Sequence, residues 1–405
     1  MNLHSDYPFW LIKDGIYNSY PKLSNDIKTE IVIIGGGITG ALISHKLTQA
    51  GFEVIVLEKN HIGQGSTSAS TALIQYDIDT PLFKLNKIYG EENAEKAYQL
   101  GGDAIDKLEE LTNKFKDKAD FKKHKSLFIA SYKKHVSEIL VPEFEARKKA
   151  GFNVRLLSEE ELKSQFGFSA PGAILSKQAA SINPYKLCNY LFEEVASKGN
   201  YIFDSTEIKE IKQKGNKVFL KTFDGIKIEA KHAIVACGYE SEKFLPNKVS
   251  QNNSTYAIIS KPHKEKIPFI NDTLIWETKS PYLYIRTTSD NRIIVGGLDE
   301  EFQDPEKRDK LITGKSKILK KKFNKLFPEI NYDIDFAWAG TFSETKHGLP
   351  YIGSCNEFQI LFAMGYGGNG ITFSTIASEV LKNIITKSKN SAIKIFSFDR
   401  DTLKK

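Results

Sequence analysis

The chain has 405 residues, 40% of them hydrophobic and 26% charged, with a formal net charge of +7 at pH 7. This length favours two interleaved domains over one simple core, and the composition is that of a globular protein. Only six of the 57 basic residues are arginine, so the charge indicates a lysine-rich surface and disfavours a nucleic-acid reader, which would rely on arginine.

The first predicted elements form a compact βαβ unit. Residues 1–27 are expected to be an extended lead-in. The apolar run 31–34 predicts a strand buried on both faces. A helix follows over 39–50, ended by glycine, and 54–57 predicts a second buried strand.

The rest of the chain is expected to contain a helical region, then antiparallel strands, and then a strand, a loop and a helix. Residues 82–116 carry apolar side chains at helical spacing. Residues 218–223 and 226–230 predict a hairpin around an Asp-Gly turn, followed by an apolar strand at 232–236. Further antiparallel strands are expected at 254–260, 274–276, 282–287 and 292–296. The chain closes with a strand at 360–363, a glycine loop at 365–370 and a helix at 371–385.

The segment after the first strand is a dinucleotide-binding motif. A GxGxxG pattern lies between a strand and a helix. Gly35 permits the tight turn, Gly37 the close approach of a pyrophosphate, and Gly40 the close packing of helix and strand. The helix N-terminus favours phosphate. Glu58 ends the second strand, where a carboxylate would accept from ribose hydroxyls and repel a 2′-phosphate.

The C-terminal glycine loop favours FAD over NAD. In Gly365-Tyr-Gly-Gly-Asn-Gly-Ile-Thr372 a second run of backbone donors opens a helix. Such a site suits the pyrimidine end of a flavin, which becomes negative on reduction. Taken alone, the segment is also compatible with an ordinary strand-to-helix loop.

Together these motifs resemble the D-amino acid oxidase superfamily of flavoproteins, which includes glycine oxidase, sarcosine oxidase and γ-glutamylputrescine oxidase. The resemblance covers nearly the whole chain. It rests on residues 35–40 with Glu58, 63–70, 234–238, 338–340, 345–353 and 365–371.

The resemblance implies an α/β fold. A Rossmann-like FAD domain (1–80, 151–245 and 336–405) would carry an inserted antiparallel-sheet substrate domain (81–150 and 246–335). It also implies FAD as cofactor, and the residues expected to bind it are Gly35, Gly37, Ile38, Thr39, Gly40, Glu58, Lys59, Gly65, Ser66, Thr67, Thr71, Gln75, Ile208, Ala236, Cys237, Gly238, Gly340, Gly367, Gly368, Asn369, Gly370, Ile371 and Thr372.

Relatives of this kind pass a hydride from a C–H beside nitrogen to flavin N5, and oxygen or another acceptor then reoxidises the flavin. The resemblance therefore implies a small amine or amino acid as substrate. The chain offers neither the histidine nor the cysteine that some relatives link to flavin, so a non-covalent cofactor is expected. The alternatives are a tailoring or RNA-modification oxidoreductase acting on an aminomethyl group, and a non-enzymatic FAD-binding protein.

Four residues are candidates for the substrate side. Phe342 stands where glycine oxidase-like sequences have a carboxylate-binding arginine, which indicates an apolar or amine substrate end, or core packing. Arg286 would replace that arginine or form a surface ion pair. His347 would lie near the flavin edge or bind loop backbone. Tyr284 is a candidate cavity aromatic, with packing as the alternative, and so are Tyr256 and Trp276.

Three separated cysteines argue against a disulfide framework or zinc site, and no metal is expected. The N-terminus lacks a basic-then-apolar leader, and no apolar run approaches the length of a membrane span. The expected compartment is the cytoplasm.

Overall fold

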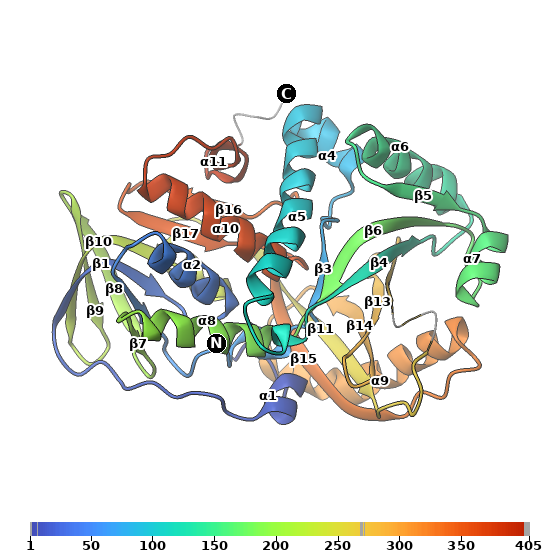
Figure 1. Cartoon of the computed structure of the whole chain (residues 1–405), viewed down its shortest axis with the longest axis horizontal. Coiled ribbons are helices and arrows are strands. Elements are labelled where there is room, and N and C mark those ends of the chain that lie inside the picture. The colour runs from blue at the N-terminus through green and yellow to red at the C-terminus, as the bar shows by residue number, and fades with distance from the viewer. Residues whose placement is uncertain (1, 6, 268–269, 271, 401–405) are drawn as a thin grey trace.

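The computed structural model describes residues 2–5, 7–267, 270 and 272–400. Two β-sheets lie side by side with helices packed on and between them (Figure 1). None of the helices in these ranges combines the length and hydrophobicity needed to cross a bilayer.

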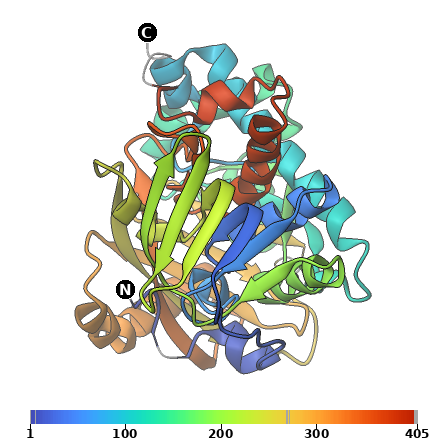
Figure 2. The ribbon, with the colours of Figure 1, turned by 90° about the vertical axis from the view of Figure 1, so that its left-hand side faces the viewer.

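The eight-stranded sheet has the order β16-β17-β10-β1-β2-β7, with the antiparallel strands β8 and β9 attached to β10. Pairing is parallel from β17 to β7, and Figure 2 views the molecule from the side of this sheet. Its strands are β1 (Ile27–Ile34), β2 (Val54–Leu57), β7 (Tyr201–Phe203), β8 (Ile208–Lys214), β9 (Lys217–Thr222), β10 (Lys227–Val235), β16 (Tyr351–Ser354) and β17 (Ile360–Met364).

Helices bury one face of this sheet. Helices α2 (Ile38–Gln49), α8 (Pro184–Ser197) and α10 (Gly370–Ile385) pack beside one another, and α5 (Glu91–Thr112) packs on α10. All four side chains of β2 and the last four of β1 are buried, as expected for parallel strands covered on both sides.

The nine-stranded sheet has the order β15-β11-β14-β13-β12-β4-β6-β3, with β5 paired to β6. Helix α9 (Pro305–Leu326) packs on β11, β14 and β15. The strands are β3 (Leu73–Gln75), β4 (Lys122–Ile129), β5 (Val154–Leu157), β6 (Ala173–Ser181), β11 (Ser250–Ser260), β12 (Thr273–Glu277), β13 (Leu283–Thr287), β14 (Ile293–Glu300) and β15 (Ile334–Thr345).

Shorter helices complete the fold. They are α1 (Phe9–Asp14), α3 (Ser66–Ala69), α4 (Leu82–Tyr89), α6 (Val141–Lys149), α7 (Glu159–Phe166), α11 (Ala392–Phe396), the 3-10 helices η1 (Lys118–Asp120) and η3 (Gly238–Phe244), and the π-helix η2 (Val136–Leu140).

Most predicted elements are present, with three corrections. The lead-in is not wholly extended, because it contains α1. The helical region 82–116 is divided at Gly90, whose φ of +78° breaks the helix between α4 and α5. The strand expected at 232–236 is not separate, because β10 runs without interruption from the hairpin to Val235.

The division of strands between the two sheets does not coincide with the expected domain boundaries. Residues 154–181, assigned to the FAD domain, supply β5 and β6 to the nine-stranded sheet. The same sheet takes β3 and all of β15, whose residues 336–345 were also assigned to the FAD domain. Sheet membership alone does not define domains, so the two domains and their boundaries remain a prediction.

Candidate active site

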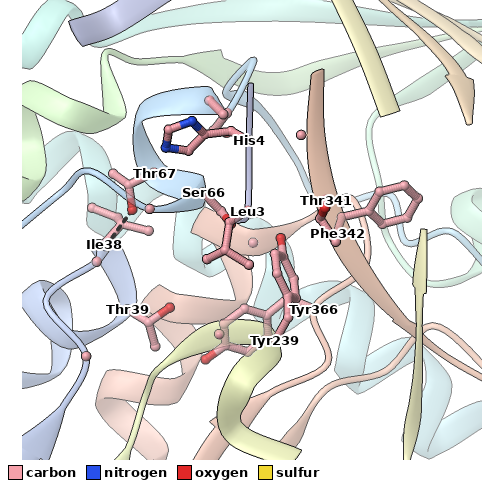
Figure 3. Close-up of a pocket in the computed structure, with 18 of the residues that line it drawn as sticks. Leu3, His4, Ile38, Thr39, Ser66, Thr67, Tyr239, Thr341, Phe342 and Tyr366 are labelled. Atoms are coloured by element: carbon pink, nitrogen blue, oxygen red, sulfur yellow. Dashed lines mark hydrogen bonds between the residues drawn. The ribbon is translucent and has the colours of Figure 1, made fainter. Parts of the chain in front are cut away.

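A cavity of about 650 Å³ lies between the two sheets. It touches the carboxyl ends of three parallel strands at Ile34, Leu57 and Ala236, where open α/β sheets bind their ligands. Its other wall belongs to the nine-stranded sheet. Figure 3 shows Thr39 and Tyr239 on one side of this space and Thr341 and Phe342 of β15 on the other.

Close packing around the first glycine motif forms one end of the cavity. Gly35 has a φ of +116°, and a Cβ there would lie 2.4 Å from the carbonyl oxygen of Ala236. A Cβ on Gly40 would lie 2.0 Å from the carbonyl oxygen of Gly35. The motif therefore requires glycine at both positions, as the sequence predicts.

Glu58 anchors the same loop. Its carboxylate accepts hydrogen bonds from the backbone N–H groups of Gly36 and Asn60, each at 2.8 Å. Burial raises the pKa of this carboxyl, and the two backbone donors oppose the shift. Lys59 beside it lines the cavity and pairs with Glu240.

The segment 63–70, the second one predicted to bind FAD, ends in a stretch whose backbone carbonyls accept hydrogen bonds from three side chains. Trp338 Nε1 donates to the carbonyl of Ala69 at 2.8 Å and Trp10 Nε1 to the carbonyl of Ser70 at 2.7 Å. The guanidinium of Arg286 donates to the next carbonyl, that of Thr71. We refer to these three donors as the carbonyl clamp.

The front of that segment contacts helix α2. Thr67 Oγ1 accepts a hydrogen bond of 2.9 Å from the backbone N–H of Ile38, as Figure 3 shows. Thr39 Oγ1 lies 2.7 Å from Ser374 Oγ of α10. The N-terminal ends of α2 and α10 are thereby joined at the cavity.

The C-terminal glycine loop closes the other end. Asn369 Nδ2 donates to the carbonyls of Gln75 and Asp77, and Thr372 Oγ1 donates to the carbonyl of Gln75 at 3.1 Å. These side chains attach the loop to β3. A Cβ at Gly367 would lie 2.1 Å from Asp79 Oδ2, so the loop passes directly over that carboxylate.

Aromatic side chains of the nine-stranded sheet line the cavity opposite the loop. Trp276 stacks on Phe128 with ring centroids 4.0 Å apart and contacts Tyr282 edge-on. Tyr284 lies over Gly296, where a Cβ would come within 2.2 Å of its ring. Phe342 of β15 extends the same wall.

Most residues expected to bind FAD lie in the cavity wall. These are Gly35, Gly37, Ile38, Thr39, Glu58, Lys59, Gly65, Ser66, Thr67, Thr71, Gln75, Ile208, Ala236, Cys237, Gly238, Gly340, Gly367, Gly368, Asn369, Gly370 and Ile371. Gly40 and Thr372 stand behind the wall and position the two glycine loops.

Two substrate-side candidates lie elsewhere. Arg286 is 2% exposed, and besides Thr71 its guanidinium donates to the carbonyls of Thr287 and Ile182. It is neither a carboxylate clamp in the cavity nor a surface ion pair, because backbone carbonyls take its donors. His347 packs edge-on against Tyr89 with ring centroids 5.3 Å apart, outside the cavity wall.

The sequence interpretation missed several cavity residues. Leu3 and His4 line the wall, because the N-terminal segment pairs with β15 at Gly340. Asp79, Tyr282 and Asp299 also line it. No local motif marks these residues, because segments far apart in the sequence bring them to the cavity.

The family model described as FAD dependent oxidoreductase (DAO) matches residues 30–384 of this chain. The chain is 24% identical over 378 residues to the gamma-glutamylputrescine oxidoreductase of Escherichia coli K12, covering 91% of this chain and 86% of that protein. It is 26% identical over 374 residues to the glycine oxidase of Bacillus subtilis 168, covering 88% of this chain and 92% of that protein.

Solved structures give the same fold. The crystal structure of glycine oxidase from Geobacillus kaustophilus superposes with a TM-score of 0.77 at 19% identity, covering 92% of this chain and 99% of that one. The α/β architecture is thus that of an FAD-binding oxidoreductase of this kind.

Proposed function

Because this chain belongs to the DAO family of FAD-dependent oxidoreductases, we propose that it oxidises a carbon–nitrogen bond of a small amine or amino acid. The observation that carries the proposal is one continuous cavity, which runs from the dinucleotide motif at Gly35 to an aromatic wall at Trp276 and Tyr284. The names of its relatives, an amine oxidoreductase and glycine oxidases, agree with this substrate range.

The residues present fit FAD. A Cβ on Gly35 would clash with the backbone of Ala236, and one on Gly37 would lie 3.2 Å from Thr67 Oγ1. Both glycines line the cavity, so backbone without side chains faces the place where a pyrophosphate would be bound. In this proposal Glu58 and Lys59, which line the cavity, hold the ribose. Gly340, Gly368 and Asn369, which also line it, hold the flavin ring.

When bound, FAD would supply the two-electron chemistry by accepting a hydride from the C–H beside nitrogen. The protein's own contribution is enclosure and orientation. Phe342, Tyr284 and Trp276 offer apolar surface to an alkyl chain and exclude water from it. The described cavity wall holds no arginine that would bind a substrate carboxylate.

We further propose that the cofactor is non-covalent. Ala69 stands in the segment 63–70, and residues 340–342 of β15 are glycine, threonine and phenylalanine, so these two places hold neither the histidine nor the cysteine that some relatives link to flavin. Acid precipitation of the yellow protein should release all FAD to the supernatant. Colour kept in the pellet would contradict this.

The function is tested by anaerobic reduction. FAD-loaded protein is mixed with primary and secondary amines, D- and L-amino acids and N-methylglycine while the visible flavin band is recorded. Bleaching by amines ahead of free amino acids is expected, because Phe342 offers no charge to a carboxylate. If no compound bleaches the flavin, the proposal fails. Stopped-flow reoxidation with oxygen and with artificial acceptors then separates oxidase from dehydrogenase.

A further inference from the structure

Three carboxylates converge at the aromatic end of the cavity from separate parts of the chain. Asp79 follows β3, Asp299 lies in β14 and Glu344 lies in β15. Asp79 and Asp299 line the cavity. Glu344 is two residues beyond Phe342, so strand alternation puts both on one face of the sheet.

The three groups repel one another. Burial raises the pKa of Asp299 to about 6, and Asp79 adds to the shift. Burial raises the pKa of Glu344 to about 7, with Asp79 and Asp299 as the next causes. Burial also raises the pKa of Asp79. Like charges gathered away from water destabilise the charged form unless a cation joins them.

No cation of the described chain joins them. None of the three carboxylates forms an ion pair with a described residue. Lys315, the lysine whose charge favours ionised Asp299, is occupied by Glu300 and by the carbonyl of Leu298. The donors that reach Asp79 are neutral: the hydroxyl of Tyr282 at 3.3 Å and the backbone N–H of Gly368 at 3.1 Å.

Two oxygen atoms at this place are buried without a hydrogen-bond partner among the described residues. One is Oδ1 of Asp299. The other is Oδ1 of Asn253, a residue 8% exposed whose Nδ2 is directed at Glu344 Oε2, 3.4 Å away. Asn253 pairs with Phe342 across β11 and β15. Both of these atoms are acceptors, so a ligand that completes them brings N–H or O–H donors. In the adjoining cavity wall, Trp276 Nε1 and the Tyr256 hydroxyl are also buried without a hydrogen-bond partner among the described residues.

The surrounding rings suit a cation. Tyr282 and Tyr284 lie with ring centroids 5.9 Å apart, and Trp276 contacts Tyr282. Aromatic faces attract an ammonium group that has left water. The three acidic groups would repel an anion at this place.

We propose that the substrate is a diamine or other dication, whose second ammonium group is bound by Asp79 and Asp299 of the cavity wall, while Glu344 and Asn253, next to them but outside that wall, complete the acidic group. This inference rests on the proposed function, since the first amino group is the one oxidised. The distal ammonium donates to the unsatisfied oxygens and cancels the repulsion among the carboxylates.

The first test uses the wild-type FAD-loaded protein. Anaerobic flavin bleaching is titrated with short α,ω-diaminoalkanes, with n-alkylamines of equal carbon number and with ω-hydroxyalkylamines. The diamine should half-saturate at a concentration about tenfold or more below the monoamine, the scale of a charge-assisted hydrogen bond. Equal values for diamine and monoamine, or for diamine and hydroxyamine, would overturn the inference while leaving amine oxidation intact.

Variants locate the effect. Asp299→Asn and Glu344→Gln keep shape and remove charge, so each should reduce the diamine-to-monoamine ratio severalfold. Glu329→Gln is the matched control, because Glu329 is exposed and lies outside the cavity wall, and its ratio should equal that of wild type. If no amine bleaches the flavin, the proposed function fails. In that case the change in the absorption spectrum of oxidised flavin on addition of the diamine still tests the site. A change no larger than that produced by the monoamine would contradict the inference.

Discussion

At Gly40, helix α2 crosses the end of β1 so closely that a single added carbon atom has no room. Gly40→Ala would put Cβ against the Gly35 carbonyl, and overpacking of this kind costs about 1–3 kcal/mol. We expect the variant to have a lower free energy of unfolding and a lower FAD content. Urea denaturation and the ratio of visible to ultraviolet absorbance measure both.

Gly314→Ala provides the control for that substitution. Gly314 is exposed within α9, and a Cβ there would meet no atom within 4 Å. Alanine at an exposed helix position should raise the free energy of unfolding by roughly 0.5–1 kcal/mol. If both variants behave alike, the packing argument at Gly40 is wrong.

Some of the site residues could be predicted from the sequence and others could not. The glycines of the dinucleotide motif could be predicted, because backbone geometry alone requires them. The environments of Arg286 and His347 could not. Arg286 is surrounded by carbonyls of Thr71 and Ile182, which are far away in the chain and come together only through the sheet.

At the scale of elements, the carbonyl clamp fixes the loop after α3. Arg286→Lys cannot donate to three carbonyls in one plane, and buried acceptors left without donors cost about 1–3 kcal/mol each. We expect weaker FAD binding and a lower free energy of unfolding. Equilibrium dialysis of FAD and denaturant titration measure these.

The same variant separates the clamp from a substrate-binding role. Because Arg286 lies outside the cavity wall, its replacement should leave the preference between amines and amino acids unchanged once the protein is fully loaded. A selective loss of amino acid turnover would show that Arg286 binds a carboxylate after all.

Elements with strong local signals were predicted well. Strand β2 has the predicted bounds, and β17 and α10 each differ by one residue. The lysine-rich helix α9 has a weaker local signal: Ile318 is 47% exposed, while Leu319 and Phe323 are fully buried. Ile318 and Leu319 are neighbours in the sequence, and helical periodicity alone does not decide which of the two faces the core.

For the molecule as a whole, the acidic end of the cavity predicts a pH dependence. Asp299 and Glu344 have pKa values of about 6 and 7 when folded and near 4 when unfolded. The folded chain therefore binds more protons between these limits, and their contribution to stability falls as pH rises from about 4 to about 7.

Comparing wild type with the double variant Asp299→Asn, Glu344→Gln isolates this contribution. The comparison is needed because buried histidines make stability rise with pH. His124, whose pKa burial lowers to about 3, is one of them. The unfolding free energy of wild type minus that of the variant should decrease between about pH 4 and about pH 7. A constant difference would show that the carboxylates titrate normally.

The division of the chain between the two sheets could not be predicted from order alone. Residues 154–181 follow a helical block and precede α8, a position compatible with either sheet. Their assignment depends on pairing between β6 and β4, which start about fifty residues apart in the sequence. Long-range pairing of this type leaves no local pattern.

The carbonyl clamp has an optical consequence. The chain contains three tryptophans: Trp10 and Trp338 donate to consecutive carbonyls of the FAD segment, and Trp276 lines the far end of the cavity. Every indole thus lies at or directly behind the cavity wall. Because oxidised flavin absorbs where tryptophan emits, cofactor loading should quench nearly all intrinsic fluorescence, so that the unlabelled protein reports its own occupancy.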